Sequence, residues 1–229
     1  METEVIRIAG RNCHMYTPSN ARHLLIQPVD EHDLEVLTEE VETIKTLTDK
    51  PFALVAFQVN DWNKELTPWP APPVFGKVPF GDGANETLHF IVEQLLPELH
   101  AENSRCLLGG YSLAGLFALW TAYQTDRFVG IAAASPSVWY PSWMDYVAAR
   151  KPLAQEVYLS LGDKEERTKN AVMGQVGKAI RKQHDLLAAQ GIRTTLEWNP
   201  GNHFVDSAKR MAKGFAWALN NDRPSPKKE

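Results

Sequence analysis

Short apolar runs alternate with segments of helical periodicity along most of this chain, and this alternation limits the possible folds more than any other feature. Residues 51–57, Pro-Phe-Ala-Leu-Val-Ala-Phe, are almost continuously apolar, as in a strand buried on both faces. After the apolar run 23–29, one helical face is formed by Leu34, Leu37, Val41 and Ile44. Strands that alternate with helices in this way predict an α/β fold, in which helices cover both faces of a single doubly wound, mostly parallel sheet.

The same patterns give approximate limits for each element. We expect strands at residues 23–29, 51–57, 105–108, 128–133, 157–161 and 194–198. We expect helices around residues 34–44 and 88–99, from residue 113 onward, and at residues 171–189 and 204–219. Because no internal repeat or Ser/Gly linker divides the chain, residues 1–220 are predicted to form one domain, and the polar residues 221–229 a disordered tail.

Composition argues against several classes of partner. The 24 Lys and Arg residues are outnumbered by 28 Asp and Glu, and no segment is basic enough to follow a phosphate backbone, so we expect no nucleic acid partner. Cys13 and Cys106 are too few for a disulfide framework, and the histidine spacing gives little support to a metal site. An acidic start without an apolar run predicts a cytoplasmic protein that binds no membrane. The oligomeric state stays open.

The predicted strand at residues 105–108 leads directly into Gly109-Gly110-Tyr111-Ser112-Leu113-Ala114-Gly115 and an apolar helix. A serine in so abrupt a strand-to-helix turn has a strained backbone, and its neighbours two positions away on each side must be small. Gly110 and Ala114 meet this requirement, although Ala114 stands where glycine is usual. The segment resembles the nucleophile elbow of α/β-hydrolases, which exposes the serine hydroxyl above the sheet. The alternative is a tight turn with a helix N-cap.

A serine nucleophile needs a base and a group that orients the base, and α/β-hydrolases carry them in the chain order serine, acid, histidine. His203 lies in a glycine-containing loop between the last predicted strand and the last predicted helix, which is where the base belongs. The acid is expected in the loop after the strand at 157–161. Three carboxylates compete there: Asp163, Glu165 and Glu166. The other two would then belong to a solvated charged loop.

From residue 51 to His203, the sequence resembles the putative-esterase family of α/β-hydrolases, which includes enterochelin-type esterases, feruloyl esterases and S-formylglutathione hydrolases. The resemblance rests on the elbow, on the run Ser-Leu-Gly-Asp-Lys-Glu-Glu from Ser160, and on Gly201-Asn202-His203-Phe204. It implies ester hydrolysis through an acyl-enzyme, without a metal or an organic cofactor. Relatives commonly place the acid about three residues after the glycine, which selects Glu165.

In the mechanism that this resemblance implies, Ser112 attacks a small or medium soluble carboxylic ester or thioester, His203 is the general base and Glu165 orients His203. The oxyanion would accept from the backbone N–H of Leu113 and from a second N–H in the loop after residue 57. The candidates for the second donor are Asn60, Asp61 and Trp62, and we assign it to Asp61.

Aromatic side chains near these loops are candidates for a substrate pocket: Trp62, Trp69, Trp139 and Trp143. The alternative is that most of these rings pack over the sheet edge as core. The short connection that carries Trp139 and Trp143 leaves room only for a minimal lid. Two further functions stay open, namely acyl transfer by the same triad, and a catalytically silent α/β-hydrolase fold that serves as a binding module.

Overall fold

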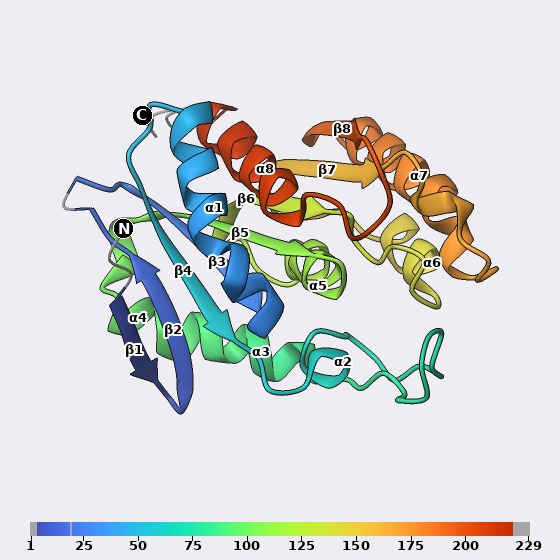
Figure 1. Ribbon diagram of the computed structural model, residues 1–229, viewed down its shortest axis with the longest axis horizontal. Helices are drawn as coiled ribbons and strands as arrows, with labels where there is room; N and C mark the ends of the chain where they lie inside the picture. Colours follow the sequence, from blue (N-terminus) through green and yellow to red (C-terminus); the bar gives the residue numbers. More distant parts are fainter. Residues whose placement is uncertain (1–3, 19, 222–229) are drawn as a thin grey trace.

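In the computed structural model, which describes residues 4–18 and 20–221, one sheet contains eight strands in the order β1-β2-β4-β3-β5-β6-β7-β8 (Figure 1). Strands β3 to β8 are parallel to one another, whereas β2 is antiparallel to both β1 and β4. The strands are β1 Glu4–Ile8, β2 Arg11–Tyr16, β3 His23–Val29, β4 Phe52–Gln58, β5 Arg105–Tyr111, β6 Phe128–Ala134, β7 Glu156–Gly162 and β8 Arg193–Asn199. The predicted α/β fold with a mostly parallel sheet is therefore confirmed.

Helices cover both faces of this sheet. They are α1 Glu31–Leu47, α2 Trp62–Glu65, α3 Ala84–Phe90, α4 Leu96–Glu98, α5 Leu113–Thr121, α6 Trp143–Ala148, α7 Val176–Ala189 and α8 Ser207–Asn221. Helices α1 and α8 lie side by side on one face, where Val41 and Ile44 share a buried cluster with Phe215 (Figure 1). Helices α3, α5 and α7 contribute to the larger cluster on the other face. The two clusters account for the apolar character of the central strands on both of their faces.

The N-terminal hairpin β1–β2 was not predicted. Its strands are short, most of their side chains are exposed or half-buried, and neither strand contains a continuous apolar run. The turn between them consists of Ala9 and Gly10, both with positive φ. Two-residue hairpin turns of this kind match the twist of antiparallel strands. The hairpin extends the parallel sheet by two antiparallel strands at its β4 edge.

Several helix limits differ from those expected. Helix α7 begins at Val176, after the 3₁₀ turn Met173–Gln175, and α8 begins at Ser207, because Asp206 has a positive φ of 54° that is not helical. The expected helix around 88–99 starts at Ala84 and contains a π-helical turn, Ile91–Leu95, just before Pro97. A proline ring clashes with the carbonyl four residues earlier, which favours such a widened turn. Apart from Asn221, the expected tail lies outside the described residues.

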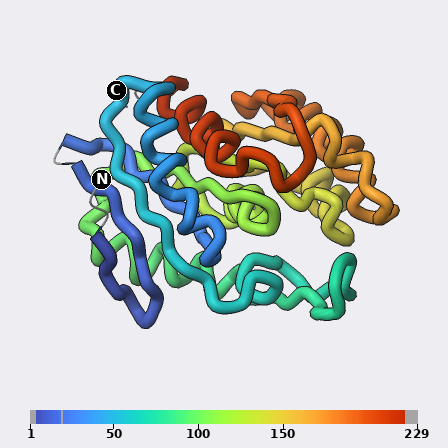
Figure 2. The backbone as a smooth tube through the Cα atoms, viewed as in Figure 1, coloured from blue at the N-terminus to red at the C-terminus, as the bar shows by residue number. Residues whose placement is uncertain are grey.

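The parallel strands end at one edge of the sheet, and the loops that follow them there carry the candidate residues. Figure 2 shows the segment after β4 running out beyond this edge before the chain returns to α3. Aromatic packing ties this segment to the connection after β6, because Trp69 contacts Tyr140 and donates from Nε1 to the Pro141 carbonyl at 2.9 Å. No helix in the described part of the chain is long and apolar enough to cross a membrane.

Candidate active site

The serine turn has the strained geometry that the sequence predicts. Ser112 joins β5 to α5 with φ 58° and ψ −119°, a sparsely populated conformation for a residue with a side chain. A Cβ on Gly110 would lie 2.3 Å from the Ala114 carbonyl carbon and oxygen, so only glycine fits there. The extra methyl group of Ala114 is accommodated, with Ala114 completely buried. Ser112 itself is half-buried at the end of the turn.

Two further loops bring His203 and Glu165 to this serine. His203 follows β8, and its Nε2 lies 3.1 Å from Ser112 Oγ, while its Nδ1 lies 2.8 Å from Glu165 Oε2 in the loop after β7. An ionised carboxylate only accepts hydrogen bonds, so Nδ1 carries the proton and Nε2 presents its lone pair to the serine hydroxyl. The arrangement can therefore move a proton from Ser112 to His203.

Glu165 is buried, and its two carboxylate oxygens accept hydrogen bonds from different donors. Oε1 accepts from Ser135 Oγ at 2.7 Å, from the Gly162 N–H at 2.7 Å and from Arg210 Nη1 at 2.9 Å. Oε2 accepts the hydrogen bond from His203 Nδ1. Burial acts to raise the pKa of Glu165, but the hydrogen bonds from His203, Ser135 and the Gly162 N–H outweigh burial and hold that pKa below its ordinary value. The carboxylate is thus ionised at neutral pH.

The two competing carboxylates of this loop point elsewhere. Asp163 Oδ1 accepts from the Gly201 N–H at 2.8 Å, which joins the loop after β7 to the loop after β8. Glu166 forms an ion pair with Arg181 on α7 at 3.1 Å. Neither contacts His203. Of the three carboxylates that the sequence left open, Glu165 is the one that the structure brings to the histidine.

The sheet order bears on the second oxyanion donor. Strand β3, and not β4, lies directly beside β5, and Ile26 is paired with Leu108. If this register is continued, Asp30 is level with Ser112. The loop between β3 and α1 therefore runs beside the elbow. The sequence analysis assigned the donor to the loop after β4, which is one strand farther away.

The hydrogen bonds of that farther loop also argue against the assigned residue. The N–H groups of Asn60 and Asp61 both donate to Glu65 Oε1 at 2.9 Å. Asp61 in turn caps α2 by accepting from the Lys64 N–H. The N–H of Asp61 thus already donates within its own loop. The assignment of Asp61 as the second oxyanion donor does not agree with this hydrogen bond.

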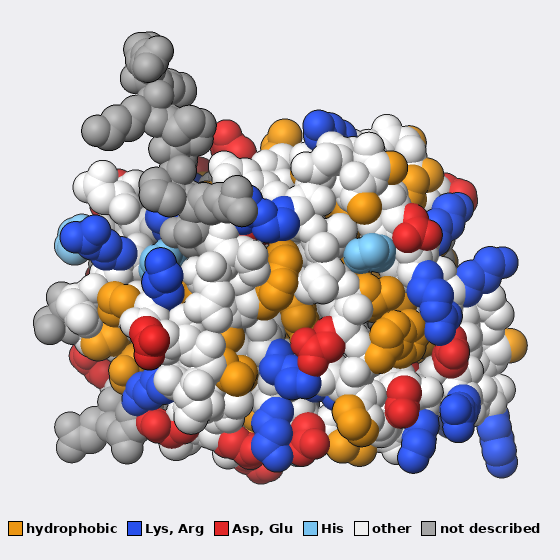
Figure 3. Space-filling view, turned by 90° about the horizontal axis from the view of Figure 1, so that it is seen from above, with side chains coloured by type: hydrophobic (Ala, Val, Ile, Leu, Met, Phe, Trp, Pro, Cys, Tyr) orange, Lys and Arg blue, Asp and Glu red, His pale blue; other side chains and the backbone are white. Residues whose placement is uncertain are grey.

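A hollow of about 440 Å³ opens beside the candidate triad and includes Glu165 and His203 in its wall. The rest of its wall contains apolar side chains, among them Trp139, Met173 and Phe204, the basic side chains of Lys164 and Arg167, and the polar side chains of Ser135, Thr168 and Asn202. Phe204 is 89% exposed. Its ring packs edge to face against the His203 ring, with 5.5 Å between the two ring centroids. On the face of the molecule that Figure 3 shows, acidic and basic side chains are interspersed.

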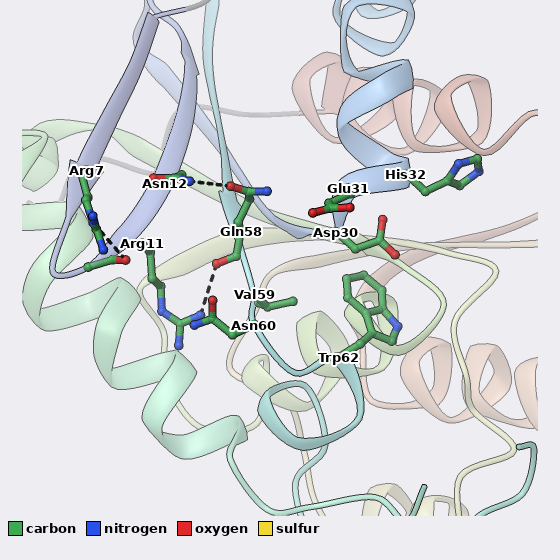
Figure 4. A pocket seen from close by; sticks show the side chains of 11 residues that line it. Arg7, Arg11, Asn12, Asp30, Glu31, His32, Gln58, Val59, Asn60 and Trp62 are labelled. Atoms are coloured by element: carbon green, nitrogen blue, oxygen red, sulfur yellow. Dashed lines mark hydrogen bonds between the residues drawn. The ribbon is translucent and has the colours of Figure 1, made fainter. Parts of the chain in front are cut away.

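Only one of the four tryptophans proposed for a substrate pocket, Trp139, lines this hollow. Trp143 is fully buried and donates from Nε1 to Gln183 Oε1 at 2.8 Å, so its assignment to the pocket is wrong. Trp69 packs against Trp143 and other aromatic rings, as the core alternative anticipated. Trp62 lines a separate hollow of about 710 Å³ between β2, the end of β4 and the start of α1 (Figure 4).

Sequence reasoning missed the residues that support the triad. Ser135 follows β6 and Tyr111 precedes the nucleophile, and both contact Arg210 of α8 at 3.1 Å. Ser137 Oγ lies 3.4 Å from Ser112 Oγ but, among the described residues, has no hydrogen bond to His203 or Glu165, so it is a neighbour of the serine and not a support of the acid or the base. One signal was available, because Arg210 is a charged residue among the small and apolar residues of α8 that face the sheet. Among the described residues, no cluster of His, Cys, Asp and Glu could hold a metal ion.

Comparison with known families decides the classification. Residues 14–213 match the model of the Putative esterase family. The chain belongs to this family. A relative, the uncharacterized protein YbbA of Bacillus subtilis (strain 168), is 25% identical over an alignment of 187 residues, and the match covers 74% of this chain and 74% of YbbA. Membership in the family supports ester hydrolysis as the class of activity.

Solved structures share the fold. The siderophore hydrolase EstA of Aspergillus nidulans has a TM-score of 0.72 at 18% identity, covering 95% of this chain and 94% of EstA. The enterobactin esterase FES of Shigella flexneri, solved in the presence of enterobactin, has a TM-score of 0.70 at 18% identity. This match covers 96% of the chain but 58% of FES, so a substantial part of FES lies outside the match. By name, EstA is a hydrolase of siderophores and FES is an esterase of enterobactin.

Proposed function

We propose that this family member is a serine hydrolase that cleaves a small or medium soluble carboxylic ester or thioester through an acyl-enzyme on Ser112. The observation that carries the proposal is the continuous line from Ser112 Oγ through His203 to Glu165, with distances of 3.1 and 2.8 Å. A serine hydroxyl is a weak nucleophile at neutral pH, and this line supplies the base and the group that orients the base.

In the proposed mechanism, His203 Nε2 takes the proton of Ser112 Oγ as the oxygen attacks the ester carbonyl. The resulting imidazolium protonates the departing alcohol or thiol, which leaves an acyl group on Ser112. Water then attacks the acyl-enzyme, with His203 again as the base, and the acid is released. Glu165 keeps its negative charge throughout, because it stabilises the imidazolium rather than taking the proton.

The tetrahedral oxyanion needs two backbone donors near Ser112. One is the N–H of Leu113 at the first position of α5, where no preceding helical carbonyl accepts it. We assign the second to Glu31, the first residue of α1, because the β3–β5 register brings this segment beside the elbow and the N–H of the preceding Asp30 already donates to Asp33 Oδ2 at 3.3 Å. Glu31→Pro tests the assignment, since proline is tolerated at the first position of a helix but has no N–H. A loss of about 10²-fold in kcat would support Glu31 as the donor, and a wild-type kcat would refute it.

The hollow beside His203 supports a preference among esters. Trp139 and Phe204 offer aromatic surface, and Lys164 and Arg167 offer positive charge. We therefore expect esters that carry both an aromatic ring and a negative charge to have a higher kcat/KM than neutral alkyl esters. Siderophore esters, the substrates named for the structural neighbours, belong in the first panel of compounds to be tested.

The test is labelling of the purified protein with a fluorophosphonate, together with hydrolysis of p-nitrophenyl acetate. We expect the wild-type protein to be labelled and to turn over, and Ser112→Ala to lose both while it keeps its melting temperature. Ser137→Ala is the matched control, since Ser137 lies beside Ser112 but has no contact with His203 among the described residues. A wild-type protein that is neither labelled nor active would refute the proposal and favour a binding module.

A further inference from the structure

Arg210 is buried in α8, with 1% of its side chain exposed, and its guanidinium group contacts the loops that carry the candidate triad. Its two terminal nitrogens donate to five oxygen atoms. Nη1 donates to Glu165 Oε1 at 2.9 Å and to Tyr111 OH and Ser135 Oγ at 3.1 Å, and Nη2 donates to the carbonyls of Pro200 at 3.0 Å and Asn202 at 2.9 Å. One side chain thus joins segments at the ends of β5, β6, β7 and β8.

These contacts constrain the base as well as the acid. The Asn202 carbonyl belongs to the peptide group that leads into His203. Tyr111 OH, which accepts from Arg210, donates to the His203 carbonyl at 2.7 Å. Burial raises the pKa of Tyr111 to about 12, so the phenol keeps the proton with which it makes this bond. The backbone of His203 is therefore held on both of its sides by groups that contact Arg210.

The contacts with Glu165 decide which carboxylate oxygen faces the histidine. Arg210, Ser135 and the Gly162 N–H all bind Oε1, so Oε2 is directed to His203 Nδ1. Only a planar, forked cation can donate to Glu165 through one nitrogen and to the histidine loop through the other. A lysine ammonium would keep the charge, but its donors all lie on one nitrogen and cannot reach both groups in this way.

We propose that Arg210 is a positioning residue for the reaction, in which its fork fixes Glu165 and the His203 loop relative to Ser112. This inference rests on the proposed function, because positioning matters only if the triad reacts. It goes beyond that function by assigning the alignment of acid and base to one arginine on α8. The competing account is that Arg210 only stabilises the fold as a buried ion pair.

The test compares Arg210→Met and Arg210→Lys with Lys213→Met. Lys213 lies one turn later on α8 and is also a cation that reaches β8, where it binds Glu197 and Asn199, but it contacts no triad residue among those described. We expect Arg210→Met to lower kcat about 10²-fold with KM changed less than about threefold, since misplacement by about 1 Å costs this much. Arg210→Lys should lose about tenfold, and Lys213→Met less than about threefold.

The pH profile separates charge from geometry. Apart from Arg210, the described charged or titratable groups near Glu165 and His203 are Tyr111 on β5 and, in the loop after β7, Asp163, Lys164, Arg167 and Glu166, which is paired with Arg181 of α7. All of these remain in each variant. Without the Arg210 charge, the Glu165–His203 pair binds a proton more tightly, so the acidic limb of kcat/KM should move to higher pH in Arg210→Met. It should stay in place in Arg210→Lys, which keeps the charge.

A purely structural role would lower the melting temperature of Arg210→Met but leave kcat and the acidic limb unchanged well below that temperature, and this result would overturn the proposal. If Arg210→Met does not fold, Arg210→Lys decides, because wild-type kcat in that variant would equally refute a need for the fork. The low-field proton NMR signal of His203 Nδ1–H provides a readout without turnover. An inactive wild-type protein would refute the proposed function, whereas a signal unchanged in Arg210→Met would refute the positioning role.

Discussion

Replacement of Glu165 by glutamine removes one charge and replaces one carboxylate oxygen, an acceptor, by an NH₂ group, a donor. The structure determines which of the two oxygens is replaced. Oε1 accepts from three donors, namely Ser135, the Gly162 N–H and Arg210. The amide oxygen must occupy this position, because an amide nitrogen there would face three donors. The amide NH₂ then replaces Oε2 and donates toward His203 Nδ1, which lies 2.8 Å from Oε2 in the native protein.

This reversal forces His203 into the other tautomer. Nδ1 must accept, so Nε2 carries the proton and can no longer take one from Ser112 Oγ, 3.1 Å away. A wrong tautomer of a triad histidine costs about 10⁴-fold in kcat, which corresponds to about 5.5 kcal/mol in the activation free energy. KM for p-nitrophenyl acetate should change little, because Glu165 lies behind the histidine. The melting temperature should stay close to that of the wild type, since three native donors keep their acceptor.

The assay is steady-state hydrolysis of p-nitrophenyl acetate, with the rate of fluorophosphonate labelling as a second measure of the nucleophile. Asp163→Asn and Glu166→Gln are matched controls, because each changes one carboxylate of the same loop that does not contact His203. Both should stay within about threefold of the wild-type kcat. A folded Glu165→Gln variant with more than a tenth of wild-type kcat would refute the reasoning, and so would a larger loss in either control.

Three further predictions follow from packing, burial and exposure. Gly110→Ala should abolish fluorophosphonate labelling, because the added Cβ would lie 2.3 Å from the Ala114 carbonyl. Ala114→Gly should keep kcat within about threefold of the wild type and lower the free energy of unfolding by about 1 kcal/mol. Equal labelling of both variants would contradict this prediction. Burial raises the pKa of Glu40 to about 8, so the stability that its protonated form contributes is complete below about pH 4.5 and is lost as the pH rises through 8. The melting temperature of Glu40→Gln should therefore fall less than that of the wild type between pH 5 and pH 9, and parallel curves would count against this burial effect. Phe204→Ala should raise KM for aromatic esters several-fold at unchanged melting temperature, because this ring is 89% exposed beside His203; an unchanged KM would remove Phe204 from the substrate pocket.

Local sequence patterns predicted much of the fold and part of the candidate site. Five of the six parallel strands, β3 to β7, were found because they contain apolar runs that are buried on both faces, whereas β8 is a half-exposed edge strand. The elbow was found because a strained serine requires small residues at Gly110 and Ala114. The hairpin β1–β2 was missed, since its short, largely exposed strands contain no continuous apolar run. The candidate base was found by chain order, which is itself a property of the sequence.

The sequence by itself determined the mostly parallel α/β sheet, the position of Ser112 in its turn and the loop that carries His203, because these depend on residues only a few positions apart. The tertiary structure decided the rest. It brought Glu165, and neither of the other two carboxylates, to His203, placed β3 beside β5, buried Trp143, and brought Arg210 to Glu165. These outcomes depend on strand order and on the directions of side chains far apart in the chain, and the local spacing of residues determines neither.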